Sequence, residues 1–466
     1  MLRMRNDQPS LWESVLPEIC LRLPAELERV DAWLDDERFL APFEPFFSTR
    51  MGRPSIPIDT YLRLMFLKHR YRLGYESLCA EVSDSISWRR FCRIDIDGRL
   101  PHPTTLMKLT TRCGEQVVAQ LNDELIAKAS ERTLVKTGKV RADTTVVPAN
   151  VEYPTDTGLL AKAVTKIGRL VKRVKAVGAA ARTPFRDRSR AAGRRVRSIA
   201  AHLRLRGAQA REEAQATVAR IASQLAGLAQ RSAEDAQAVL RSARRALREV
   251  TGHAKGQLRR AINELAVTIR RTGQVISQTR TRLAGGKPDS ATRLVSLHDP
   301  DARPIAKGRL GKPVEFGYKA QVVDNEDGIV LDHTVEEGNP PDAPQLAPAV
   351  ERIAARTGRT PRAATADRGY GEARVETALH DLGVNTVAIP RKGKPGTTRQ
   401  THERKPGFRR LVKWRTGCEG RISHLKHRYD WDRTRLDGLT RARTWCGYGV
   451  LAHNLNKITT LAAANA

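Results

Sequence analysis

Three acidic residues stand at positions where a carboxylate needs a special reason. Asp143 interrupts a β-branched run, KVRADTTVV, Asp367 ends the apolar run AATAD ahead of two glycines, and Glu419 lies in the helical pattern RTGCEGRISHLK. A charge inside a strand is costly unless it is paired or bound to a metal. Carboxylates converging from two strands and a helix can ligate two divalent cations ~3.5–4 Å apart, an arrangement that cleaves phosphodiesters. Taken singly, each residue could also be an ordinary surface or capping carboxylate.

Two cations flank the glutamate. Arg415 lies four residues before Glu419 and Lys426 seven after it, so all three project from one side of a helix. We expect Arg415 and Lys426 to bind DNA phosphates beside the metal ions. The simpler alternative is a structural ion pair between Arg415 and Glu419.

Several other residues compete for these roles. Asp332, Asp342 and Glu372 are carboxylates that could each replace one of the three. Two histidines, His333 and His424, are expected to have structural roles. Two tryptophans, Trp431 and Trp445, are expected to pack in the core rather than to stack on a DNA base.

The elements that must position the carboxylates follow from the hydrophobic pattern. Helices are expected at 342–358, 372–382, 411–429 and 439–461, and 391–410 is expected to be a basic linker. Five strands are expected, with a hairpin turn at NEDG: 139–147, 314–324, 328–336, 362–367 and 385–389. Three strands followed by alternating helices and strands predict a mixed α/β fold with helices on the faces of a mixed five-stranded sheet.

A long insertion separates the first strand from the others. Residues 161–290 contain 30 Lys and Arg against 8 Asp and Glu, with Phe185 as their one aromatic residue. Ala, Arg, Gln and Leu dominate and favour helix. We expect a long basic helical hairpin or coiled-coil-like insert with no deep core of its own; a partly disordered basic spacer is the alternative.

The N-terminal part has a different pattern. Short helices are expected at 58–72, 75–82, 86–92 and 104–125, in an order that resembles a helix-turn-helix arrangement. DNA binding and dimerisation are both compatible with such a bundle. We therefore expect four segments: 1–135 helical N-terminal, 136–157 first catalytic part, 158–295 insertion, and 296–466 catalytic remainder with C-terminal helices.

Composition indicates the partner. The 466 residues carry 82 Lys and Arg against 51 Asp and Glu, a net charge of +31. Such a surplus favours a polyanion as partner. An apolar run long enough to span a membrane and a signal peptide are both absent from the sequence, which argues against a membrane role. Six unpaired-looking cysteines suit a reducing cytoplasm, and the surplus charge suits association with the nucleoid.

The motifs carry a family resemblance. RADTTVV with Asp143, ADRGYG with Asp367, and R-x3-E-x6-K with Glu419 resemble the signature of bacterial insertion-sequence transposases of the DDE type, the group with a Tyr-Arg-Glu-Lys motif. The stretches GRPSIPIDTYLRLMFLKHRYRLGYESL and PHPTTLMK resemble the N-terminal helical domain of the same proteins, and VEYPTDTGLL and HDPDARPIAKGRLGKPVEFGYKAQ resemble further parts of them. Val412 stands where the motif has Tyr, with Trp414 as a substitute. Only 52 residues separate Asp367 from Glu419, and the insertion follows the first strand instead.

The resemblance implies a mechanism. The catalytic domain would be RNase H-like, and Asp143, Asp367 and Glu419 would coordinate two Mg²⁺ ions, with Mn²⁺ as a substitute. Arg415 and Lys426 would hold phosphates. The partners would be double-stranded DNA, at the element ends and at the target, and a second copy of the chain. Two alternatives stay open: an inactive DNA-binding protein derived from a transposase, and an RNase H-like nuclease for RNA–DNA hybrids.

Overall fold

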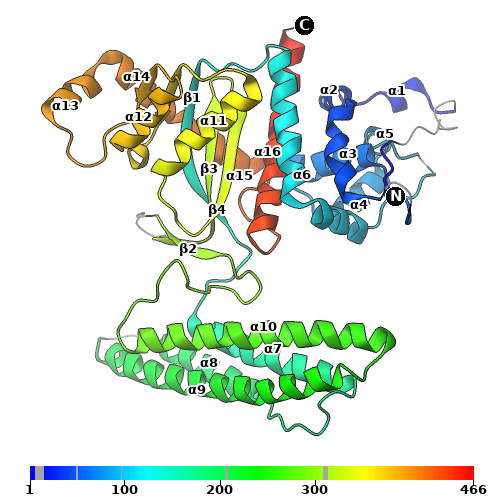
Figure 1. The fold of residues 1–466 in the computed structure, drawn as a ribbon, viewed down its shortest axis with the longest axis vertical. Coiled ribbons are helices and arrows are strands. Elements are labelled where there is room, and N and C mark those ends of the chain that lie inside the picture. Colours follow the sequence, from blue (N-terminus) through cyan, green and yellow to red (C-terminus); the bar gives the residue numbers. More distant parts are fainter. Residues whose placement is uncertain (6–14, 49–50, 96, 205–207, 308–312, 466) are drawn as a thin grey trace. The chain divides into compact units, whose positions relative to one another are not determined.

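Two units make up the chain in the computed structural model, which describes residues 1–5, 15–48, 51–95, 97–204, 208–307 and 313–465 (Figure 1). One unit comprises residues 1–149 and 318–466, and the other comprises residues 150–317. No helix in the described ranges is both long enough and apolar enough to cross a membrane.

A mixed sheet forms the centre of the first unit. Strand β1 (Lys139–Pro148) pairs in parallel with β5 (Ala363–Ala366), which pairs in parallel with β6 (Thr386–Ala388). On the other side of β1 lies β3 (Val314–Asn325), which is antiparallel to β4 (Val330–Glu337). The predicted mixed α/β class is confirmed.

The strand count differs from the prediction. A sixth strand, β2 (Arg303–Ala306), pairs with the first residues of β3, so the expected five-stranded sheet is wrong. The four residues of β2 include a proline and are too few to show a two-residue period in the sequence. The predicted hairpin between β3 and β4 is confirmed, with Gly328 at a positive φ of 78° that a turn favours.

Helices cover the sheet. The 3₁₀ turn η4 (Ala343–Gln345) leads into α11 (Leu346–Thr357), which buries an apolar stripe and ends at Gly358 in the left-handed conformation. After β5, η5 (Arg368–Tyr370) precedes α12 (Ala373–Asp381).

The segment expected to be a linker is helical. Helix α13 (Thr397–Arg404) lies wholly within 391–410, and α14 (Pro406–Arg415) begins there. Salt bridges rather than an apolar stripe fix α13: Arg399 bonds Glu376 of α12 at 2.8 Å and Glu403 at 2.8 Å. The single helix expected at 411–429 is also wrong, because α14 ends at Arg415 and α15 (Gly417–Arg428) starts after Thr416.

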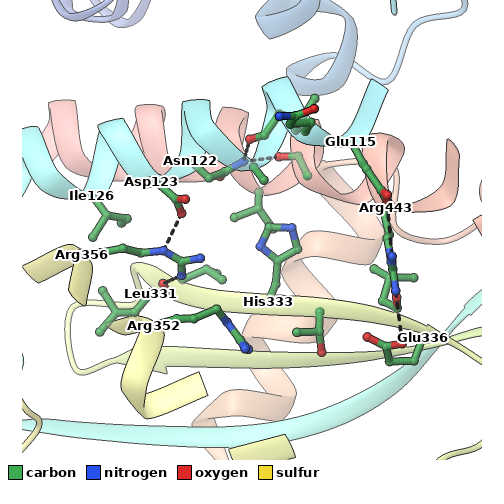
Figure 2. A pocket seen from close by; sticks show the side chains of 18 residues that line it. Glu115, Asn122, Asp123, Ile126, Leu331, His333, Glu336, Arg352, Arg356 and Arg443 are labelled. Carbon is green, nitrogen blue, oxygen red and sulfur yellow. Dashed lines mark hydrogen bonds and ion pairs between the residues drawn. The ribbon is translucent and has the colours of Figure 1, made fainter. Parts of the chain in front are cut away.

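The last helix, α16 (Leu439–Ala464), packs against α6 (Pro103–Glu131). Gly447 of α16 permits this close approach, because a Cβ at that position would clash with Val118 of α6. Figure 2 shows how this helix pair meets β4 and α11 around a cavity of about 450 Å³: Arg356 pairs with Asp123, and Arg443 pairs with Glu115 and Glu336. The helices and the sheet are therefore locked together by ion pairs as well as by apolar packing.

The N-terminal helices pack against α6 and α16. They are, in order, α1 (Glu18–Leu21), α2 (Ala25–Leu34), η2 (Glu37–Phe39), η3 (Ala41–Phe46), α3 (Ile58–Arg70), α4 (Tyr75–Asp84) and α5 (Ile86–Phe91). Both α2 and α3 contact α16, and Tyr61 of α3 hydrogen-bonds Tyr448 of α16 at 3.1 Å. The helices predicted at 58–72, 75–82 and 86–92 are present within two residues of their expected ends, whereas the helix predicted at 104–125 continues to Glu131.

The described residues of the second unit contain four helices, α7 (Asp156–Ala176), α8 (Ser189–His202), α9 (Ala208–Ala246) and α10 (Gly252–Leu283). The prediction of helices is confirmed, but the four helices pack as a bundle and not as the expected hairpin, and the expected absence of a deep core is also wrong. Two clusters of buried aliphatic side chains run through the bundle, one around Leu160 and Leu225 and one around Val171 and Leu265. Alanines fill the contacts between the helices, so small side chains suffice for close packing.

Candidate active site

Asp143 and Asp367 lie side by side at the sheet. The last paired residues of β1 and β5 are Ala142 and Ala366, and the two aspartates come directly after them. Because the two strands are parallel, both carboxylates emerge at the same edge. Asp143 Oδ1 accepts a hydrogen bond from the Thr144 amide at 2.8 Å, and Asp367 Oδ1 accepts one from the Gly369 amide at 2.8 Å.

Arg415 connects this pair to Glu419. Its Nη1 donates to Asp143 Oδ2 at 2.9 Å, and its Nη2 donates to Glu419 Oε1 at 3.1 Å. The guanidinium side chain is 16% exposed, whereas the Glu419 side chain is 63% exposed at the start of α15. The ion pair between Arg415 and Glu419, which was the simpler alternative to a phosphate contact, is therefore present, and it extends to Asp143.

Burial and neighbouring carboxylates raise the pKa of both aspartates. Burial, followed by the negative charges of Asp367 and Glu419, raises the pKa of Asp143 to about 6, against the lowering effect of Thr144 and Arg415. Burial and the nearby charge of Asp342 raise the pKa of Asp367. Like charges held together in a partly dry site indicate a need for a cation.

The donor set suits a divalent cation. Among the described residues, no three His, Cys, Asp or Glu side chains gather tightly enough to hold a metal ion. The guanidinium of Arg415 bridges two of the carboxylates and supplies positive charge between them. Carboxylate oxygens are the ligands that hard cations prefer, so the side chains at this site are suited to bind a divalent cation. Such a cation would compete with the guanidinium of Arg415 for the same carboxylates.

Comparison with known proteins gives the family. Residues 20–112 match the Transposase domain (DUF772), and residues 281–455 match the Transposase DDE domain. The chain belongs to the DDE transposases of insertion sequences. Members of this family act on DNA and generally use divalent metal ions. The second match includes Asp367 and Glu419, whereas Asp143 lies outside both matched ranges. No solved structure matches the transposase.

The other predicted cation of the transposase faces the sheet. Lys426 Nζ donates to the carbonyl oxygen of Val146 on β1 at 2.7 Å. Two cations of β1 lie over the ring of Trp414, with Arg141 Cζ 4.6 Å and Lys139 Nζ 5.2 Å from the ring centroid. Both residues thus join α14 and α15 to β1.

A buried ion pair that sequence reasoning missed supports the same contact. Asp324 is fully buried, and its carboxylate accepts two hydrogen bonds from Arg141, at 2.7 and 2.9 Å. Arg421 of α15 approaches the same carboxylate at 3.4 Å. The signal in the sequence was an arginine in the middle of a strand, two residues before Asp143.

The alternative carboxylates have different surroundings. Asp332 is 1% exposed and bound by Arg352 and Arg356, so it is structural. Glu372 pairs with Arg374 and Lys392. Asp342 lies beside the site: a Cβ at Gly369 would be 2.9 Å from Asp342 Oδ2 and 3.0 Å from Asp367 Oδ1. Lys319 holds Asp342 at 2.6 Å.

The aromatic candidates of the transposase are packed. Trp431 and Trp445 are 0% and 3% exposed, and their ring nitrogens donate to the carbonyls of Cys446 and Asp430. His424 lies against Tyr429 and His453. His333 is largely buried on β4, and burial lowers its pKa to about 4.

Proposed function

We propose that this transposase binds the terminal inverted repeats of its own insertion sequence and catalyses metal-dependent strand cleavage and strand transfer. The observation that supports the proposal is that Asp143 and Asp367 follow neighbouring residues of two paired parallel strands, and that Arg415 bonds both Asp143 and Glu419. Catalysis would occur in an RNase H-like domain made of residues 136–157 and 296–466. The remaining segments, 1–135 and 158–295, would bind DNA or a second copy, in the cytoplasm of a bacterium.

Asp143, Asp367 and Glu419 would hold two Mg²⁺ ions, or Mn²⁺ in their place. Such ions supply Lewis acidity for attack on a phosphodiester by water or by a 3′-hydroxyl. Asp143 and Asp367 would be the metal ligands with fixed positions, since β1 and β5 hold their backbones. Glu419 would provide the adjustable donor, since its side chain is exposed.

Arg415 would exchange partners during this reaction. In the structure it neutralises Asp143 and Glu419. With cations on the carboxylates, its guanidinium would turn to a DNA phosphate, a bidentate acceptor of the same geometry. Lys426 would assist at the phosphates, and its bond to Val146 keeps it close to β1.

The test is cleavage of a labelled duplex that carries the DNA flanking the gene, in Mg²⁺, by the unmodified chain and by Glu419→Gln. We expect a cut at a defined end that exposes a 3′-hydroxyl, and its loss in the variant. Since the Glu419 side chain is exposed, the variant should fold normally. Binding without cleavage by either protein would support the inactive DNA-binding alternative, and cleavage of RNA–DNA hybrids without strand transfer would support the nuclease.

A further inference from the structure

A wide groove lies on the N-terminal helices, away from the carboxylates. It has a volume of about 960 Å³ and is lined by the segment before α3, residues 93–95 and 98–102, and the start of α6. A second hollow of about 350 Å³ shares Arg53, Ser55, Ile56 and Thr105 with it. The two hollows therefore form one continuous surface, which we call the N-terminal groove.

Positive charge dominates the N-terminal groove. Among the described residues that line it, Asp95 is the one carboxylate, against six cations: Arg3, Arg53, Arg93, Arg99, Lys108 and Arg112. Arg93 is held by Asp35 at 2.9 Å and by Asp59 at 3.4 Å. Arg53, Arg99, Lys108 and Arg112 are exposed. Such an excess of one sign in a concave surface attracts anions.

The backbone of the groove is fixed. Arg89 Nη1 donates to the carbonyls of Asp95 at 2.6 Å and Gly98 at 3.2 Å. The amides of Ile58 and Asp59 donate to the carbonyls of Arg3 and Met4. The cations are thus presented from a rigid frame, which reduces the entropy lost on binding.

A buried hydroxyl gives an independent sign of a ligand. Thr60 lines the groove, is 3% exposed, and its Oγ1 has no hydrogen-bond partner in the described part of the chain. Buried polar atoms nearly always have partners. Thr60 lies in the first turn of α3, and the groove also meets the first turn of α6, so two helix N-termini add positive potential there.

We propose that the N-terminal groove binds the phosphate backbone of duplex DNA at the element end. The cations are spread over two joined hollows rather than gathered around one point, which suits a row of phosphates better than a compact anion. This inference rests on the proposed function and gives it a site for end binding that is separate from the carboxylates.

The experiment measures binding rather than catalysis. The Glu419→Gln chain is titrated into a fluorescent 40-base-pair duplex carrying the DNA that flanks the gene, at several salt concentrations. A double variant, Arg53→Gln with Arg99→Gln, should reduce the slope of log K against log salt by about 1.8, because each phosphate contact contributes about 0.9. If the variant and the parent bind equally at 1 M salt, this difference in slope makes the variant bind roughly 60-fold more weakly than the parent at 0.1 M salt.

A matched control removes the same charge elsewhere. Arg359 and Arg362 are exposed beside β5, outside the groove, so Arg359→Gln with Arg362→Gln should leave the slope within about 0.5 of the parent. Thr60→Val should weaken binding about threefold to tenfold at every salt concentration, without a change of slope, because a hydroxyl carries no charge.

Equal slopes for the two double variants would overturn the groove as the DNA site. The double variant Arg53→Gln with Arg99→Gln is also made in the chain that keeps Glu419. If that protein cleaved the flanking duplex normally, the proposed function would stand and only the assignment of the groove would fail. Failure of the parent chain to bind any duplex would overturn both.

Discussion

The charge on Asp143 should destabilise the folded protein, and Asp143→Asn should therefore stabilise it. The side chain is 12% exposed. Burial and the charges of Asp367 and Glu419 raise its pKa from 3.8 to about 6. A carboxyl whose pKa is raised on folding contributes stability that is complete below 3.8 and is lost as the pH rises through 6.

The magnitude follows from these two values. Their difference, 6 − 3.8 = 2.2, corresponds to about 3 kcal/mol at 1.36 kcal/mol for each pH unit. Asparagine carries no charge at any pH, so the free energy of unfolding should rise by up to about 3 kcal/mol at pH 8. The gain should fall to about half at pH 5 and nearly vanish at pH 3.5.

Tryptophan fluorescence during urea denaturation measures this effect in the relevant unit. All six tryptophans lie outside residues 150–317, so their signal does not report on the four-helix bundle. Asp332→Asn is the contrasting variant. Its carboxylate is buried against Arg352 and Arg356, and its loss should cost about 3–5 kcal/mol.

Two outcomes would refute the reasoning. An unchanged denaturation midpoint for Asp143→Asn at pH 8 would mean that the site does not strain the fold. An equal gain at pH 4 and pH 8 would mean that the stabilisation comes from packing and not from charge.

Three further predictions test the same electrostatics. Mg²⁺ at ten times its dissociation constant should raise the unfolding free energy of the parent by about 1.4 kcal/mol, and a thermal scan should show no such shift for Asp143→Asn. Arg415→Gln removes a charge that lowers the pKa of Asp143, so the acidic limb of the pH–rate profile should move to higher pH, whereas Arg415→Lys should move it less. Arg141→Leu leaves Asp324 buried with only the longer contact to Arg421, and urea titration should show a loss of about 3–5 kcal/mol, against a smaller loss for Arg141→Lys.

Local patterns predicted most of the sheet. The β-branched residues of β1 and the NEDG turn between β3 and β4 specify their conformations within a few residues, so their neighbours in sequence sufficed. Helix α13 was missed because its stability comes from Arg399, which reaches Glu376 more than 20 residues away in the chain. A contact of that separation leaves no periodic signal.

The insertion illustrates a limit of composition. With few large side chains it seemed unable to build a core, yet its alanines let four helices approach closely and bury leucines and valines between them. Residue counts report how much apolar area is available, whereas helix spacing decides how well it is buried.

By itself, the amino-acid sequence determined the chemistry that is available: a polycationic chain, three carboxylates in distinctive motifs, and their resemblance to DDE transposases. Only the tertiary structure decided which groups meet. The parallel register of β1 and β5 brings Asp143 beside Asp367 across more than 200 residues, Arg415 joins Asp143 to Glu419, and Lys426 turns to Val146. Residue types set charge and hydrogen-bonding capacity locally, but the partners that use them are set by strand pairing and helix packing between distant segments.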